Sequence, residues 1–234
     1  MDENEWLECA DPKAMFARVR DAIDQRKHRL LACACVRSVW HNLQDERFRA
    51  MVELAEEYAD GRATFERLQQ ADKVLFEVIS QMNFSQILTK PALPAMVAAR
   101  SVGNRTVDER FYEAMRYTLL SAAPCIPSGT SDAFAQPDPG SKTAHTRHLA
   151  DLFRDIVGNP FRRVVLHPDW LAWNDGTVGR LAETIYEERR YQDLPVLADA
   201  LEDAGCDDPR VIGHLRGKGV HARGCWVLDL ARGV

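Results

Sequence analysis

The chain has 234 residues, of which 46% are hydrophobic and 28% are charged. This composition is typical of a globular protein and is too apolar for a disordered chain. The formal net charge of −5 argues against a protein dedicated to coating nucleic acid or binding an anionic membrane. No stretch approaches the roughly 20 apolar residues of a membrane span, and the acidic start lacks the basic and apolar regions of a secretory signal. We therefore expect a soluble, cytoplasmic protein without a membrane partner.

The first 61 residues carry strong helix signals. Asp11-Pro12 has the form of an N-cap followed by a first-turn proline, and it predicts a helix that runs to about residue 23. The segment 26–43 has one apolar stripe and most of its charges at its start, so we expect it to be a buried central helix. An amphipathic helix follows, and Gly61 predicts its C-terminal end.

The middle of the chain is less regular. Amphipathic spacing continues over residues 65–82, and Thr106 and Glu109 have the spacing of a capping box at the start of another predicted helix. Residues 123–142 are rich in Pro, Gly and Ser and form the best candidate for a long loop. We expect two helical regions on either side of this loop, packed as one unit, over residues 1–122 and 143–234.

The last third of the chain is also mainly helical. One helix is expected to end at the breaker Gly158-Asn159-Pro160, and further helices are expected at 177–191, 194–204 and 209–216. The only convincing strand signal lies at residues 163–166. The predicted fold class is all-α, a compact multi-helix array with at most a short β segment near residues 163–166.

Three motifs are distinctive as a set: RLLACACVRSVW at residues 29–40, GNPFR at 158–162, and HLRGKGVHARGCWVLDL at 214–230. Through them and their flanks, the chain resembles a family of bacterial proteins with no established activity. The resemblance covers the N-terminal quarter and nearly the whole C-terminal third, and it implies a bacterial protein but no particular reaction. Members of that family often carry cysteine where this chain has Val36 and Leu215, so a metal site that needs either position as a ligand is not expected here.

The best candidate for chemistry is a C-terminal set of thiols and imidazoles, namely Cys206, His214, His221 and Cys225. Zinc favours these ligand types and often takes them as closely spaced pairs. His221 and Cys225 have three residues between them, as a ligand pair around a turn can have, whereas the seven residues between Cys206 and His214 are not a standard spacing. Zinc is therefore a candidate cofactor, and the alternative is that the cysteines fill the core while the histidines lie at the surface or cap helices.

Cysteine thiols and clustered carboxylates are the other candidate catalytic groups in the sequence. A nucleophilic cysteine would be Cys225 activated by His221, or Cys35 paired with His41. Apolar surroundings favour inert thiols at both positions, and the absence of a secretory signal makes a disulfide framework unexpected for the six cysteines. The carboxylates that could act together are best interpreted as a solvated helix face; they are Asp199, Glu202 and Asp203, with Glu187 and Glu188 upstream.

Basic and aromatic residues give the candidates for an interaction surface. Positive charge gathers near both ends of the chain, and the RGKGVHARG segment is glycine-rich, but it lacks the P-loop pattern. Pairing with acidic helices is the competing explanation for these residues. Trp170 and Trp173 could present an aromatic patch or fill the core. The interaction candidates are Trp170, Trp173, Arg216 and Arg223.

The sequence contains no dinucleotide fingerprint, nucleophile elbow, HExxH or kinase signature. Our leading hypothesis is therefore a non-enzymatic interaction or adaptor module that binds another protein through a helical groove. The first alternative is a metal-dependent or thiol enzyme, which predicts that His214, His221 and Cys225 converge in space. The second alternative, binding of nucleic acid, is disfavoured by the charge and predicts one continuous basic face.

Overall fold

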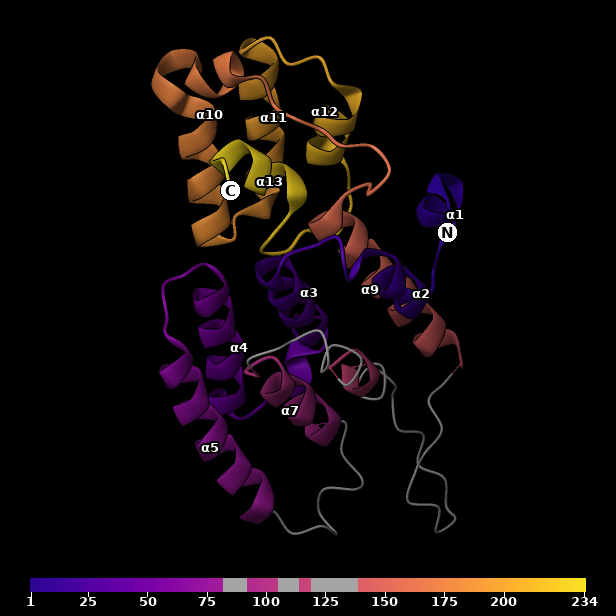
Figure 1. Ribbon diagram of the computed structural model, residues 1–234, viewed down its shortest axis with the longest axis vertical. Helices are drawn as coiled ribbons and strands as arrows, with labels where there is room; N and C mark the ends of the chain where they lie inside the picture. The colour runs from indigo at the N-terminus through magenta and orange to yellow at the C-terminus, as the bar shows by residue number, and fades with distance from the viewer. Residues whose placement is uncertain (82–91, 105–113, 119–138) are drawn as a thin grey trace. The chain divides into compact units, whose positions relative to one another are not determined.

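The computed structural model describes residues 1–81, 92–104, 114–118 and 139–234. Within these ranges every regular element is a helix, which confirms the predicted all-α class (Figure 1). The chain forms two compact units, one of Cys9–Ala150 and one in which Met1–Glu8 joins Asp151–Val234. The loop expected at 123–142 lies largely outside the described residues, and the division between the units falls within a helix.

The Cys9–Ala150 unit is organised around one buried helix. Its elements are α2 (Pro12–Val19), α3 (Gln25–Arg37), η1 (Trp40–Asn42), α4 (Glu46–Ala59), α5 (Phe65–Gln81) and α7 (Ala92–Ser101), followed by the start of α9 (Pro139–Val157). Helix α3 packs against α4 and α7, and α4 packs against α5 and α7. All nine residues from His28 to Val36 are buried, so the central helix expected from the apolar stripe is confirmed. It ends at Arg37 rather than at residue 43, and Trp40–Asn42 form the separate helix η1.

An aspartate at the N-cap begins each of α2, α3 and α4, and the sequence predicts the first of these caps. The Asp11 carboxylate accepts a hydrogen bond of 2.9 Å from the Lys13 N–H at the start of α2. Helix α2 ends at Val19 rather than near residue 23, because the N–H groups of Ala22 and Ile23 both donate to the Val19 carbonyl and close a turn. The predicted stop at Gly61 is confirmed, since this glycine has a φ of 73° just after α4.

A charged pair joins α3 to α4. Arg37 donates two hydrogen bonds to the Glu56 carboxylate, of 2.6 and 2.7 Å, and the Glu56 side chain is only 3% exposed. The Arg37 guanidinium also lies over the Trp40 ring, 4.4 Å from its centroid. A bidentate pair of this kind fixes the relative rotation of two helices because both its charges need their partner.

We predict that Glu56→Gln lowers the free energy of unfolding by about 2 kcal/mol, because Arg37 then loses its carboxylate while remaining three-quarters buried. Urea unfolding of the full chain measures the change. Glu46→Gln is the matched control, since Glu46 pairs with Arg49 at the surface and is 78% exposed. That control should cost less than about 0.5 kcal/mol, and equal losses in the two variants would contradict the prediction.

The second unit contains α1 (Glu3–Glu8), the last turns of α9, α10 (Pro168–Glu188), η2 (Tyr191–Asp193), α11 (Leu194–Asp203), α12 (Pro209–Arg216) and α13 (Trp226–Arg232). Helix α10 packs on α11 and α13, and α12 packs on α11 and α13 (Figure 1). A break over Trp173–Gly176 divides α10, because Asn174, Asp175 and Gly176 adopt positive φ. The helix predicted from residue 177 is therefore the second half of α10.

The short β segment allowed near residues 163–166 is not formed. Residues 163–167 have no regular secondary structure, and no strand occurs in the described ranges. The alternation that suggested a strand is present, with Leu166 5% exposed and Val165 79% exposed. A strand also needs a neighbouring backbone for its hydrogen bonds, and this segment simply connects α9 to α10.

The GNPFR motif attaches α1 to the end of α9. Gly158 has a φ of 73° immediately after α9, and Asn159 donates a hydrogen bond of 2.8 Å to Glu3. Arg162 forms an ion pair with the same carboxylate at 2.6 Å. These bonds, with the Arg162 guanidinium as a principal cause, hold the pKa of Glu3 below its usual value. The motif thus ends one helix and docks another.

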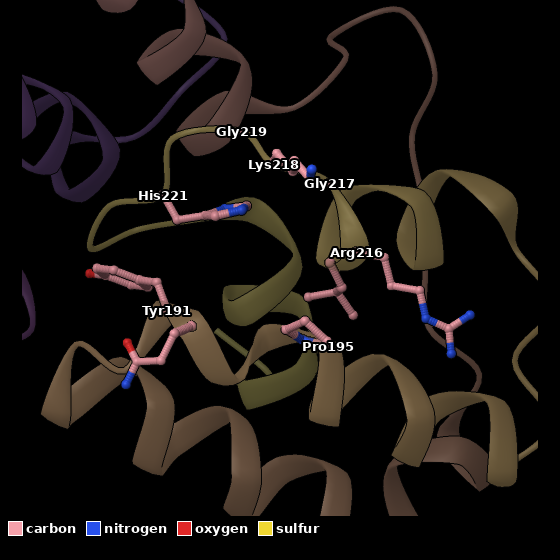
Figure 2. A pocket seen from close by; sticks show the side chains of 9 residues that line it. Tyr191, Pro195, Arg216, Gly217, Lys218, Gly219 and His221 are labelled. Carbon is pink, nitrogen blue, oxygen red and sulfur yellow. The ribbon is translucent and has the colours of Figure 1, made fainter.

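A pocket of about 450 Å³ lies in this unit, between the start of α11 and the loop that follows α12 (Figure 2). Such a volume is within the range of small-molecule sites. Among the described helices, none combines the length and the apolar character required to cross a membrane.

Candidate metal centre

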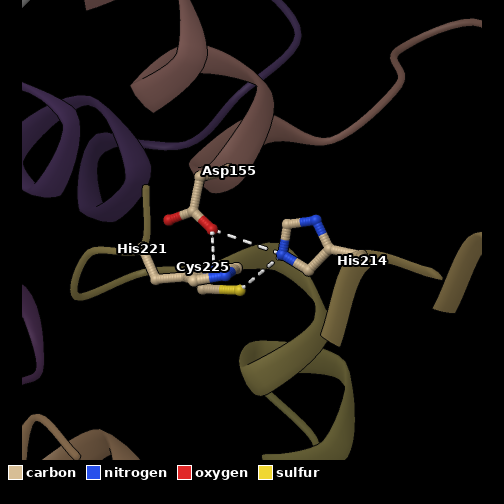
Figure 3. A group of neighbouring side chains, drawn as sticks. All are labelled: Asp155, His214, His221 and Cys225. Atoms are coloured by element: carbon tan, nitrogen blue, oxygen red, sulfur yellow. Dashed lines mark hydrogen bonds and ion pairs between the residues drawn. The ribbon is translucent and has the colours of Figure 1, made fainter. Parts of the chain in front are cut away.

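Four side chains with metal-binding atoms meet in the Asp151–Val234 unit. Asp155 comes from the last turn of α9, His214 from α12, His221 from the following loop, and Cys225 from the N-cap of α13. One ligand atom of each lies within 4.8 Å of those of the other three. Figure 3 shows the carboxylate, the two imidazoles and the thiol converging on one point.

The distances between these atoms are close to those of a small coordination shell. The Nε2 atom of His214 lies 3.1 Å from Cys225 Sγ and 3.3 Å from Asp155 Oδ1. The Nδ1 atom of His221 lies 2.8 Å from the same Oδ1. Tetrahedral zinc with bonds of about 2.0–2.3 Å separates its ligand atoms by roughly 3.3–3.6 Å, so small movements of the side chains would admit the ion.

Asp155 is a buried carboxylate that lies against two imidazoles. Its side chain is 2% exposed, and its contacts include the two imidazoles and the Ala222 N–H, which donates to Oδ2 at 2.8 Å. Burial opposes ionisation, but hydrogen bonds from His214 and His221 outweigh it and hold the pKa of Asp155 below its usual value. The Asp155 carboxylate therefore favours its ionised form inside the protein.

Cys225 is a fully buried thiol, with none of its surface exposed. Burial, followed by the negative charge of Asp155, raises its pKa well above the usual value for a thiol. Without a cation the thiol is therefore neutral, and it lacks the exposure and the lowered pKa of a nucleophilic cysteine. A bound metal ion would reverse this balance, because coordination favours the thiolate.

Trp226 borders the centre from the first position of α13. Its indole N–H points at Nδ1 of His214 over 3.3 Å, and the two rings are 5.2 Å apart. This contact makes Nδ1 an acceptor and places the proton of a neutral ring on Nε2. Coordination through Nε2 requires that proton to leave, so metal binding would reorganise the contact between His214 and Trp226.

Three of the four metal ligands predicted from the sequence lie at this centre. His214, His221 and Cys225 lie together, as the enzyme hypothesis required, whereas Cys206 is not in the cluster. Cys206 is 2% exposed in the hydrophobic core between α11 and α12, where burial raises its thiol pKa. It has the role of a small core residue.

Asp155 was missed as a candidate. Its signal in the sequence is a charge beside the apolar residues Leu152, Phe153 and Ile156 of one helix, in the same segment as GNPFR. Sequence spacing could not connect it to the histidines, since 66 residues separate it from His221.

The interaction candidates do not gather into one cluster. Trp170 and Trp173 are partly buried against the hydrophobic core. Arg216 pairs with Asp199 and Glu202, which explains that acidic helix face. Arg223 is 7% exposed, stacks on the Tyr186 ring at 4.4 Å and pairs with Glu187. These ion pairs give the nucleic-acid hypothesis no support.

The thiol alternative at Cys35 also gains no support. Cys35 is fully buried in α3, and burial raises its pKa to about 12. A thiol with this pKa is protonated at neutral pH and is therefore not an activated nucleophile.

Comparisons with protein-family models, with curated proteins and with solved structures found no match. A function for this protein must therefore be proposed from the arrangement of the side chains at the candidate metal centre.

We predict that Gly158→Ala destabilises the protein more than Gly61→Ala does. Both glycines have a φ of 73°, so both variants bear the cost of a left-handed residue, about 1–2 kcal/mol. Only at Gly158 would the new Cβ also meet a ring, 3.1 Å from Cγ of Trp226; at Gly61 nothing lies within 4 Å. Urea unfolding compares the two, and tryptophan emission should change in Gly158→Ala alone. Equal destabilisation would show that the indole does not rest on this backbone.

Proposed function

We propose that the protein binds one zinc ion through Asp155, His214, His221 and Cys225, and that the ion holds together the end of α9, α12 and α13. The observation that carries the proposal is the convergence of four ligand atoms within 4.8 Å. A mixed set of one sulfur, two nitrogens and one oxygen suits Zn²⁺, which accepts all three donor types in four-coordinate sites.

Charge balance supports a divalent ion. Zn²⁺ with one carboxylate, one thiolate and two neutral imidazoles has no net charge, which suits a buried position. Without the ion, Asp155 is an ionised carboxylate at 2% exposure that lies against two imidazoles and one backbone N–H. A metal ion compensates such a charge more completely than two imidazoles and one N–H can.

Burial supports a structural rather than a catalytic ion. Catalytic zinc usually keeps one position for water or substrate, whereas structural zinc is enclosed by four protein ligands. Here the four ligands belong to the chain, and their side chains are between 0% and 18% exposed. The proposed role is thus to fix a loop and two short helices, which agrees with the non-enzymatic function expected from the sequence.

A direct test uses Co²⁺ in place of zinc. We predict that the full chain, stripped of metal and then titrated with Co²⁺, binds one equivalent and shows a sulfur-to-cobalt charge-transfer band with tetrahedral d–d absorption. Cys225→Ala should abolish the charge-transfer band, because it removes the only thiol in the cluster. Zinc should displace cobalt, and it should raise the melting temperature of the wild-type chain.

Cys206→Ala is the matched control, since Cys206 is also buried but stands outside the cluster. It should keep the band at the same stoichiometry. Absence of the band in the wild-type chain would overturn the zinc proposal, and loss of the band in Cys206→Ala with retention in Cys225→Ala would show that the wrong thiol had been assigned.

The affinity for zinc should depend on pH through Cys225. Its raised pKa means that the metal-free thiol stays protonated to beyond about pH 9, so coordination must release this proton. We therefore predict that the apparent association constant rises about tenfold for each unit of pH between about pH 7 and about pH 9. Competition with a chelator of known proton affinity measures it. A constant that does not change with pH would mean that the thiol is not a ligand.

A further inference from the structure

The pocket beside the metal centre has a positive lining. Nine residues line it: Tyr191, Gln192, Pro195, Leu215, Arg216, Gly217, Lys218, Gly219 and His221. None of them is acidic, two carry a positive charge, and Tyr191, Pro195 and Leu215 supply apolar surface. A ligand with an anionic group and a small apolar part matches this combination.

Lys218 is the cation available to such a ligand. It is exposed, and within the described ranges it forms no ion pair. Arg216 is different, because its guanidinium binds Asp199 and Glu202; Figure 2 shows it extending away from Tyr191 and His221. The C-terminal end of α12 borders the pocket at Gly217 and carries a partial negative charge, which Lys218 offsets.

Backbone donors border the same space. Gly219 has open space around the position of a side chain, with nothing within 4 Å. The N–H groups of Lys218 and Gly219 donate to no carbonyl in the described part of the chain. Pro195, in the first turn of α11, lines the pocket as an apolar residue without an N–H, and the Leu194 N–H donates to the Tyr191 carbonyl. The donors that remain for an anion are therefore the N–H groups of the loop, Lys218 and Gly219.

His221 supplies a buried donor or acceptor without a partner. Its side chain is 9% exposed and lines the pocket, yet Nε2 has no hydrogen-bond partner in the described structure, while Nδ1 contacts Asp155. An unsatisfied buried nitrogen is unusual. If Nδ1 coordinates zinc, the ring proton is on Nε2, and this nitrogen then needs an acceptor.

The pocket-lining loop lies between two of the proposed zinc ligands. Five successive lining residues, 215–219, fall between His214 and His221. Zinc bound at both ends would restrict this segment and keep its N–H groups and Lys218 in position. A preorganised loop loses less conformational entropy when it binds a ligand.

We infer that this pocket binds a small molecule through an oxyanion, a phosphate or a carboxylate group, which is held by Lys218 and the loop N–H groups beside Nε2 of His221. The inference rests on the proposed function only in that zinc fixes the loop. Zinc content and anion binding are measured separately, so that either can fail alone.

The experiment uses the zinc-loaded, ¹⁵N-labelled full chain, titrated with inorganic phosphate and separately with acetate at constant ionic strength. We expect the bound anion to cause saturable shifts of the amide resonances of Lys218, Gly219 and His221. Lys218→Ala should weaken binding about tenfold with its zinc content unchanged, and Lys13→Ala, an exposed lysine of α2, should bind as the wild-type chain does. The anion that binds with the lower dissociation constant identifies the group that the pocket prefers.

Three results would overturn the inference. The first is the absence of saturable shifts with both anions in protein that contains one equivalent of zinc. The second is equal binding by Lys218→Ala and wild-type chains. The third is a set of shifts confined to Asp155, His214 and Cys225, which would place the anion on the metal instead. If the wild-type chain takes up no zinc but still binds phosphate through Lys218, the zinc proposal fails while the pocket stands.

Discussion

The buried carboxylate of Asp155 is the interaction on which the C-terminal unit depends. One oxygen meets both imidazoles, and the other accepts the Ala222 N–H. Through these contacts the end of α9 holds α12 and the loop that leads into α13. Helices as short as α12 and α13 are not stable alone. A charge that is expensive to bury thus becomes the point at which three segments are joined, and a divalent ion would make that junction stronger.

The surroundings of the centre serve the same junction. Gly158 ends α9 with a left-handed backbone and leaves room for the Trp226 ring. Trp226 in turn contacts His214 with its N–H. The residues of GNPFR and of the HARGCW stretch are therefore explained together: the first ends a helix against an indole, and the second carries a ligand, a cap and that indole within six positions.

The proposed zinc site and the pocket have different roles in this unit. The metal ligands are almost completely buried, so an ion among them is suited to holding structure. The pocket on the other side of the His214–His221 loop is open to solvent and has the spare cation, backbone donors and apolar walls that a ligand needs. The proposed zinc site and the pocket share residues 214–221, so a change at the proposed metal is expected to alter the order of the residues that line the pocket.

The sequence by itself determined the helical class, the buried central helix α3, the cap at Asp11 and the stop at Gly61, because each of these depends on neighbours within a few positions. It also supplied His214, His221 and Cys225, which are close together in the chain. Only the tertiary structure decided that Asp155 completes the set and Cys206 does not, that residues 163–167 lack a partner strand, and that α1 joins the C-terminal unit. These features depend on contacts across more than sixty residues, and periodicity contains no information about which distant segments will share a charge or a hydrogen bond.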